Sequence, residues 1–393
     1  MRQMSKWMLG TAMLALLALL AGCASVKVAT TAPAATDVEP VNPRWTFGPE
    51  RIAPGSSDGH HAPRKLAVLL PMTGDLATAA GPVRDGLLAG YYGAQGGKPE
   101  LAFYDTSATP AGAIAARDRA IAEGADQIVG PLGREQVSAL FASPQPVPLL
   151  ALNRGNLDPP DNAADFSLAP EDEGTAIAAH LLSRNALQVL VLSNGDDHAQ
   201  RSVQTFREAL EAGGGAIVGT LAIVGDTPGD QSAALRSVAT REGGVDAVLI
   251  ALRGNEARVV VPQLFAAGLG DRLRVATSQL TSGTGDAAED RALDGIAFVS
   301  ETWTTSGLPG LPSPATLAVD LPTARGPAAR LFAFGHDAWL LSANLHRLAS
   351  RPEAGVDGAT GRLSLSRDGR VLRTPAWATF SGGLVVPLRG AGN

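Results

Sequence analysis

Short apolar runs alternate with segments of helical periodicity from Lys65 onward, and this alternation restricts the fold more than any other feature of the chain. The run LAVLL at 66–70 leads into the loop Pro71-Met72-Thr73-Gly74, which is typical of a buried strand that ends at a loop. Apolar residues at helical spacing follow, behind Pro82, a residue suited to a first helical turn. The next expected elements are strands at 101–104, 127–129 and 147–152 and helices at 111–123 and 135–141. The pattern predicts an α/β fold with a parallel sheet covered by helices on both faces.

A second series of the same kind begins at Pro170-Glu171-Asp172-Glu173, where three acids suit the first turn of a helix. The expected strands are 187–193, 217–223, 247–252 and 273–277, and the helices are 199–212, 232–241 and 256–267. Two successive series of similar size predict two similar lobes. The tail differs: an apolar stripe from Ala338 to Leu348 predicts a final helix, and 362–365 and 377–380 are expected to form a hairpin with a turn at Asp368-Gly369.

The N-terminal residues have the layout of a secretory signal, with Arg2 and Lys6 ahead of an apolar stretch that ends in small residues. The stretch is shorter than the roughly 20 residues that a membrane-spanning helix needs. Cys23 is the only cysteine, so it has no partner for an internal disulfide. Leu20-Ala21-Gly22-Cys23 resembles a bacterial lipobox, which implies lipidation of Cys23. The alternative is an ordinary signal peptide with an incidental cysteine.

Residues 24–63 carry six prolines and show no helical or strand periodicity, which is typical of a flexible tether. Trp45, Phe47 and Ile52 are unusual in such a segment, and we expect them to dock locally on the folded part. Loss of residues 1–22 removes two basic residues and no acidic one, so the formal charge changes from −6 to −8. This balance disfavours nucleic acid or an anionic lipid surface as the main partner.

Five segments together carry a resemblance to a known family. They are KLAVLLPMTGDLATAAGPVRDGLLAGYY, QIVGPLG, FSLAPEDEG, FAFGHDAWLL and GATGRLSLSRDGRVLRTPAWATFSGG, in this order. They are similar to the type I periplasmic-binding-protein fold, in the branch of outer-membrane lipoproteins that activate penicillin-binding proteins (LpoA-type activators). The resemblance covers Lys65 to Gly383 and implies two Rossmann-like lobes with an interlobe cleft.

The resemblance also implies the domain limits. We expect a signal peptide at 1–22, a lipidated tether at 23–63, an N-lobe at 64–168 plus 298–350, and a C-lobe at 169–297 plus 351–393. Longer family members carry a helical-repeat domain ahead of this fold, where this sequence has only the tether. His336 stands where the family usually has tyrosine.

Enzyme signatures are weak or missing in the sequence. Gly55-Ser56-Ser57-Asp58-Gly59 fits a hydrolase motif, but it lies in the tether without the strand and helix that the motif requires. No zinc-protease, phosphate-loop or dinucleotide motif occurs. His60 and His61 could form a weak metal site, but two histidines in a linker are usually only solvated, and the other histidines share no ligand spacing. A helix cap at Asp196 or Asp197 explains the acids of SNGDDH better than catalysis does. We therefore expect no catalytic residues, no metal site and no cofactor.

Candidate cleft residues follow from the rule that ligands of open α/β sheets lie beyond the carboxyl ends of the strands. Small and hydroxyl side chains there suit a carboxylate or amide ligand, and an arginine could hold an anion. The alternative is that the glycines and prolines only form tight turns. The candidates are Thr73, Gly74, Thr106, Gly130, Pro131, Leu132 and Asn153 in the first lobe and Ser193, Arg253 and Gln279 in the second.

The resemblance implies an interaction protein rather than an enzyme. It would be anchored in the outer membrane through its N-terminal lipid, face the periplasm, and stimulate a bifunctional peptidoglycan synthase, a class A penicillin-binding protein. One alternative is a solute-binding protein for an amino acid or an amide-like ligand. A weaker alternative is a hydrolase that acts on the cell wall. Composition and periodicity alone reach only a two-lobed periplasmic protein without an enzyme signature.

Overall fold

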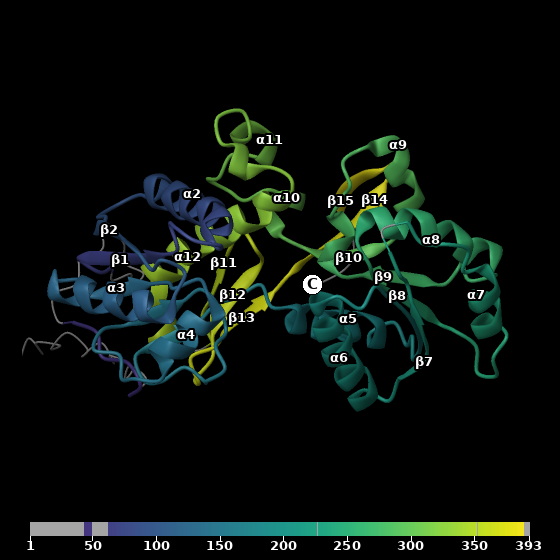
Figure 1. Ribbon diagram of the computed structural model, residues 1–393, viewed down its shortest axis with the longest axis horizontal. Coiled ribbons are helices and arrows are strands. Elements are labelled where there is room, and N and C mark those ends of the chain that lie inside the picture. Colours follow the sequence, from purple (N-terminus) through teal and green to yellow (C-terminus); the bar gives the residue numbers. More distant parts are fainter. Residues whose placement is uncertain (1–42, 49–61, 226, 352, 389–393) are drawn as a thin grey trace, which may run out of the picture. The chain divides into compact units, whose positions relative to one another are not determined.

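The computed structural model describes residues 43–48, 62–225, 227–351 and 353–388. The expected signal peptide, the lipidation site Cys23 and the tether residue Ile52 lie outside these ranges. A five-stranded parallel sheet, a seven-stranded mixed sheet and a small antiparallel sheet, together with the helices around them, make up the described part (Figure 1). The α/β class predicted from the alternating pattern is confirmed. No helix of the described ranges is long and apolar enough to cross a membrane.

The first sheet has five strands in the order β2-β1-β3-β4-β5, all paired in parallel. Its strands are β1 (Lys65–Leu70), β2 (Glu100–Asp105), β3 (Gln127–Val129), β4 (Leu149–Ala151) and β5 (Ala163–Asp165). Its helices are α2 (Ala77–Gly93), α3 (Pro110–Ala122) and α4 (Arg134–Phe141). The side chains of β1 alternate between two buried clusters, one with α2 and one with α3 and α4. The sheet is therefore buried on both faces, as its continuous apolar strands require.

The long helix α12 (Pro327–Ser350) covers the same face of the first sheet as α2, and the two helices approach each other closely. Two glycines allow this approach. A Cβ on Gly86 would lie 1.9 Å from the carbonyl oxygen of Phe332, and a Cβ on Gly335 would lie 2.0 Å from that of Val83. No side chain larger than hydrogen fits at either position without moving a backbone.

The second sheet has seven strands in the order β15-β14-β10-β9-β8-β6-β7. Its strands are β6 (Gln188–Ser193), β7 (Ala216–Ala222), β8 (Ala247–Ala251), β9 (Leu273–Ala276), β10 (Ala297–Ser300), β14 (Ala376–Ser381) and β15 (Leu384–Pro387). Its helices are α5 (Pro170–Leu182), α6 (Asp197–Ala212), α7 (Ser232–Ala239), α8 (Gly254–Ala266) and α9 (Ala287–Asp290). Strands β6 to β10 pair in parallel, whereas β14 and β15 add an antiparallel edge.

The expected C-terminal hairpin pairs differently from the prediction. The turn at Asp368-Gly369 joins β12 (Arg362–Leu365) to β13 (Val371–Thr374), and β11 (Gly355–Asp357) completes this small sheet. The predicted pairing of 362–365 with 377–380 is therefore wrong, because 377–380 belongs to β14 and pairs with β10. Buried side chains of β11, β12 and β13 join the cluster of α12 and β1.

A buried carboxylate ties α12 to the loop before β12. Asp337 is fully buried and accepts hydrogen bonds from the backbone N–H of Ala359 (2.6 Å), the backbone N–H of Thr360 (2.7 Å) and the Thr360 hydroxyl (2.6 Å). The neighbouring His336 places its Nδ1 3.4 Å from the same carboxylate. The motifs GHDA and GATG, far apart in sequence, thus form one structural unit.

The segment between β10 and α12 contains the short helices α10 (Thr302–Thr305) and α11 (Pro314–Leu317). Its leucines pack around the buried Trp303 and Phe332. Three connections carry the chain between the two α/β units: 166–169 after β5, Glu301 after β10, and Pro375 between β14 and β13, whose small sheet packs on the first unit. Several polar groups described below lie on or next to these connections.

Candidate functional site

In the first sheet, the predicted candidates Thr73, Gly74 and Thr106 hold loops together. The Thr73 hydroxyl donates to Asp105 Oδ2 at 2.7 Å, and the backbone N–H groups of Met72 and Ser107 donate to Asp105 Oδ1. The Thr73 hydrogen bond and these backbone N–H groups lower the pKa of Asp105. Gly74 has a positive φ of 81°, and Thr106 is fully buried, where it accepts from Gln136 Nε2 at 3.1 Å.

The other candidates of this lobe also form turn structure. Gly130 has a φ of 99°, and a Cβ there would lie 2.0 Å from the Leu69 carbonyl oxygen. The Pro131 carbonyl accepts from the backbone N–H of Leu152 at 2.9 Å. Asn153 Nδ2 donates to the Leu132 carbonyl at 2.9 Å. In each case the contacts support the alternative reading, in which these residues shape the loops.

In the second sheet, the structure brings Arg253 and Gln279 together in one pocket of about 580 Å³. The pocket lies at the carboxyl ends of β8, β9 and β10, where open α/β sheets commonly bind ligands. Most of its lining residues are of polar type: His198, Ser278, Thr281, Ser282, Thr284, Ser300, Glu301, Thr304 and Arg330 join the two candidates Arg253 and Gln279. Ser193 lies elsewhere, in a groove of about 600 Å³ beside α6.

Asp196 links the predicted pocket residues to helix α6. It accepts from the backbone N–H of Ala199 at 2.8 Å and is the N-cap of α6, which confirms the cap expected in SNGDDH. Burial would raise the pKa of Asp196, but the Ala199 N–H, the Gln279 side chain and Arg253 lower it below its usual range. Arg253 Nη2 lies 3.4 Å from Asp196 Oδ2, and the Arg253 side chain is 48% exposed.

A buried ion pair lies at the base of this pocket. Glu173, in the first turn of α5, is fully buried and accepts from the backbone N–H of Ser278 (2.9 Å), the Ser278 hydroxyl (2.7 Å) and Arg330 Nη2 (2.6 Å). Burial alone would raise the pKa of Glu173. The charge of Arg330, His198 at 3.6 Å and the Ser278 N–H outweigh burial and hold that pKa well below its usual range.

Arg330 joins three parts of the chain. From the second turn of α12, it contacts Glu173 on α5, the hydroxyl of Ser278 after β9, and Glu301, whose Oε1 lies 2.8 Å from Arg330 Nε. Burial opposes the charged guanidinium, but Glu173 and Glu301 raise the pKa of Arg330 above its usual value. The group is thus a charge-paired network at the connections between the sheets.

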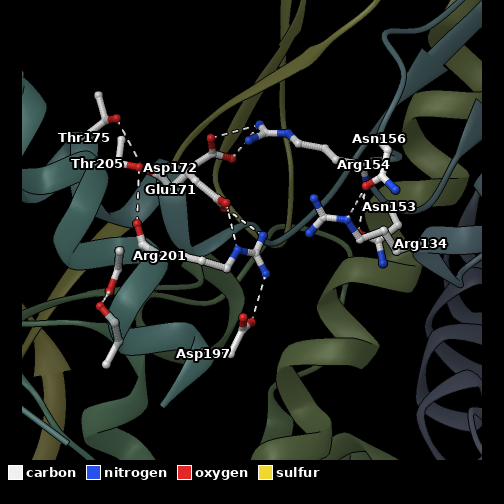
Figure 2. Close-up of polar contacts among 12 residues, drawn as sticks. Arg134, Asn153, Arg154, Asn156, Glu171, Asp172, Thr175, Asp197, Arg201 and Thr205 are labelled. Atoms are coloured by element: carbon white, nitrogen blue, oxygen red, sulfur yellow. Dashed lines mark hydrogen bonds and ion pairs between the residues drawn. The ribbon is translucent and has the colours of Figure 1, made fainter. Parts of the chain in front are cut away.

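Two further arginine–carboxylate pairs lie at the N-terminus of α5 (Figure 2). Arg154, in the loop after β4, donates through Nη2 to both oxygens of Asp172 at 2.9 and 3.0 Å. Arg201, on α6, holds Glu171 with two parallel hydrogen bonds of 2.8 and 2.9 Å. The three acids that the sequence assigned to a first helical turn therefore each pair with a different arginine.

The sequence did not identify the buried network as a unit: Glu173 was expected only in a first helical turn, Ser278 only in a loop at a strand end, and Arg330 was not singled out. Glu173 and Arg330 are 157 positions apart, and Ser278 lies 105 positions from Glu173. The one available signal was a third acid at a position of α5 that helical periodicity places on the buried face. Arg330 stands in the apolar segment of α12 without any motif.

The described residues of this pocket offer groups for binding. The Ser278 hydroxyl donates to Glu173 and receives a hydrogen bond from Arg330. Although burial raises the pKa of Glu173, the charge of Arg330 outweighs it and holds that pKa well below its usual range, so this carboxylate is a weak base for the Ser278 proton. Within the described ranges, no three histidine, cysteine, aspartate or glutamate side chains are placed to hold a metal ion. The pocket can supply hydrogen-bond donors and acceptors together with one half-exposed guanidinium.

Two parallel α/β units joined by three connections define the type I periplasmic-binding-protein fold, and solved structures share it. The LpoA C-domain from Haemophilus influenzae, described as a regulator of PBP1A, matches with a TM-score of 0.69 at 22% identity, over 82% of this chain and 99% of that one. A putative branched-chain amino acid ABC transporter protein from Chromobacterium violaceum matches with a TM-score of 0.65 at 28% identity, over 80% and 99%.

The family follows from the sequence match. A family model described as LppC putative lipoprotein matches residues 58–220 and 229–383, so the chain belongs to the LppC lipoprotein family. Its relatives include the penicillin-binding protein activator LpoA of Klebsiella pneumoniae, 29% identical over 73% of this chain and 44% of the relative. LpoA of Escherichia coli is 26% identical over 74% of this chain and 47% of the relative. The chain spans about half the length of these relatives, which are named activators, not enzymes.

Proposed function

We propose that this lipoprotein binds a class A penicillin-binding protein and activates its synthesis of peptidoglycan. The observation that supports this is the family match over most of the fold, together with relatives that are named penicillin-binding protein activators. The part shared with those relatives is the two-sheet body. We therefore assign the activating contact to this body.

The mechanism we propose is conformational. An activator without catalytic groups can raise a rate only by binding the active state of the enzyme more tightly than its resting state. The preference must come from a surface of fixed shape. The close packing of α2 on α12 and the paired charges at the connections between the sheets supply such rigidity.

The location we propose is the outer membrane, with the body in the periplasm. Cys23 would carry the lipid, and Ala24 and Ser25 after it favour sorting to the outer membrane in the lipoproteins that this signal resembles. Several acyl chains give durable anchoring, at about 0.8 kcal/mol for each buried CH₂. Labelling of the protein with a radioactive fatty acid, lost in Cys23→Ala, tests this part.

Direct binding tests the central proposal. A soluble fragment of residues 43–393, which retains the buried Trp45, is immobilised and exposed to each purified class A penicillin-binding protein of the organism. We expect saturable binding to at least one of them and none to a transpeptidase-only penicillin-binding protein. Absence of binding to every class A enzyme would contradict the proposal.

A second candidate function rests on the pocket that contains Arg253 and Gln279. Its volume of about 580 Å³ lies within the range of small-molecule sites, and its half-exposed guanidinium suits a carboxylate. A thermal-shift screen of amino acids and short peptides against the fragment tests it. A hit should be lost in Arg253→Ala and kept in Arg272→Ala, which changes an exposed arginine outside the pocket.

A further inference from the structure

Residues Arg44 to Phe47, which we call the clamp, are tied to the folded body although they precede its first strand. Trp45 is 6% exposed and belongs to the same core cluster as β1 and α12. Its ring stacks on that of Phe47 at 5.6 Å, and the Phe47 ring meets the His346 ring of α12 edge-on at 4.9 Å. The aromatic residues that looked out of place in a tether therefore form part of the core, as expected for Trp45 and Phe47.

Polar contacts fix the clamp more specifically than apolar burial alone. The Arg44 guanidinium donates to the carbonyl oxygens of Pro159 (2.5 Å), Pro160 (3.0 Å) and Arg367 (3.1 Å) and lies 3.3 Å from Asp161. It thus bridges the loop before β5 and the β12–β13 turn. An arginine that donates to several carbonyls at once is held in a defined orientation.

The clamp backbone is also paired. Asn162 donates its backbone N–H to the Arg44 carbonyl at 2.8 Å, and its side-chain Oδ1 accepts from the backbone N–H of Thr46 at 2.5 Å. Asn162 Nδ2 in turn donates to the Gln145 carbonyl at 3.0 Å. This two-sided pairing sets the register of the clamp on the body.

The clamp changes the length of chain between a lipid at Cys23 and the body. Without it, the body would begin at Ala62, and the intervening chain could extend to about 130 Å at about 3.3 Å per residue. With it, the body begins at Pro43, and the limit falls to about 66 Å. For flexible chains of these lengths the r.m.s. spans are about 34 and 25 Å.

We propose that the clamp is a positioning device: it fixes where the anchored segment joins the body and halves the chain available to reach a partner. This rests on the proposed membrane anchoring but not on the identity of the partner. The contacts supply the specificity, because one arginine, one tryptophan and one asparagine join three segments that are distant in sequence.

Energy transfer between the body and a membrane tests the proposal on the full lipidated chain. A cysteine introduced at Val319, which is 81% exposed, carries a donor dye, since the single natural cysteine is the acylated one. The protein is reconstituted in vesicles that contain acceptor-labelled lipid. Releasing the clamp with Arg44→Ala/Trp45→Ala should move the body outward by about 10 Å and lower the transfer efficiency.

The controls separate release of the clamp from loss of the fold. Arg44→Ala/Phe47→Ala keeps the core tryptophan and should lower the transfer in the same direction. Circular dichroism must show native helix content in both variants. A second label at Val224, also 81% exposed, excludes a local rotation of the first site. Equal transfer in the wild type and in both folded variants would overturn the proposal.

Tether shortening connects the clamp to the proposed activity. Deleting 26–40 leaves the clamped chain about 5 residues between Cys23 and Pro43, or about 17 Å of reach, whereas the released chain keeps about 24 residues. Stimulation of a membrane-embedded synthase should be lost in the clamped deletion and recovered when the clamp is released. If the 26–40 deletion abolishes stimulation whether the clamp is intact or released, the clamp does not control how far the body reaches from the membrane. If the soluble fragment 43–393 stimulates nothing, the proposed function fails, and the energy-transfer result still decides the clamp.

Discussion

Replacing Arg330 by methionine should destabilise the protein more than replacing its partner Glu173 by glutamine. Removing one member of a buried ion pair costs about 3–5 kcal/mol, because the other charge stays buried without its partner. Arg330→Met leaves the fully buried Glu173 with only Ser278 and His198, so we expect the upper half of that range. Glu173→Gln leaves Arg330, which is 24% exposed, with Glu301 at 2.8 Å, so we expect about 2–3 kcal/mol.

The double variant measures the coupling of the pair. Glu173→Gln/Arg330→Met has no unpaired charge from this pair, so its loss should be smaller than the sum of the single losses by about 2 kcal/mol or more. The matched control is the pair Arg154 and Asp172, whose side chains are 21% and 22% exposed. Solvent screening should reduce the coupling there to about 1 kcal/mol or less.

Urea unfolding of the fragment 43–393 at pH 7 and pH 3.5 provides the measurement. The pKa of Glu173 is lowered in the folded state, so its contribution is complete above its usual pKa of 4.5 and declines as the pH falls further. The wild type should therefore lose more stability than Glu173→Gln between the two pH values. Additive single losses, or equal acid sensitivity of the two proteins, would refute the reasoning.

Three other substitutions test separate parts of the structure, each by urea unfolding. Burial raises the pKa of Asp165 to about 6 despite two nearby arginines. Ionisation of Asp165 therefore lowers the free energy of unfolding as the pH rises from about 4 to 6. Asp165→Asn should remove this decline and raise the free energy of unfolding by up to about 3 kcal/mol above pH 6. A stability curve with unchanged pH dependence would count against this. Asp337→Ala leaves three buried hydrogen-bond donors without an acceptor and should lower the free energy of unfolding by about 3–5 kcal/mol. A decrease of less than about 1 kcal/mol would contradict this prediction. Gly335→Ala forces a Cβ to 2.0 Å from the Val83 carbonyl and should cost at least about 2 kcal/mol, whereas Gly81→Ala on α2, with open space around it, should be neutral or stabilising.

The elements of both large sheets could be predicted from periodicity, and most agree with the structure to within one or two residues. The run at 66–70 is β1, the segment 199–212 is most of α6, and a cap was expected at Asp196 or Asp197, of which Asp196 is the N-cap. These features depend on local sequence. Strands β5, β10 and β15 were missed, because β5 is only Ala163–Asp165 and β10 and β15 have four residues each.

The pairing of distant segments could not be predicted in the same way. The C-terminal residues 362–365 and 377–380 both alternate like strands, and nothing local shows that the second of them joins β10. Glu173 and Arg330 meet only because α5 and α12 flank the same connections. Trp45 is the exception, since a tryptophan in a proline-rich segment is itself a signal of burial.

The strand-end rule selects positions in the sequence but does not give the role of the residue at each position. Arg253 and Gln279 line a cavity at strand ends of the second lobe. Thr73, Thr106 and Asn153 are at equivalent strand ends, yet their polar atoms bond neighbouring segments: Asp105 at the end of β2, Gln136 on α4 and the Leu132 carbonyl after β3. A polar residue at a strand end can contact either a ligand or a neighbouring loop. The sequence does not distinguish these two roles, because the residue type and its position are the same in both. Their assignment to a ligand stays a prediction.

The rate of glycan polymerisation by the organism's class A penicillin-binding proteins, titrated with the fragment 43–393, tests the proposed function most directly. We predict a several-fold increase that saturates, with a midpoint equal to the dissociation constant of the binding experiment and no effect of heat-denatured fragment. An unchanged rate at concentrations that saturate binding would contradict activation. The protein would then be a binding partner of the synthase without the proposed role.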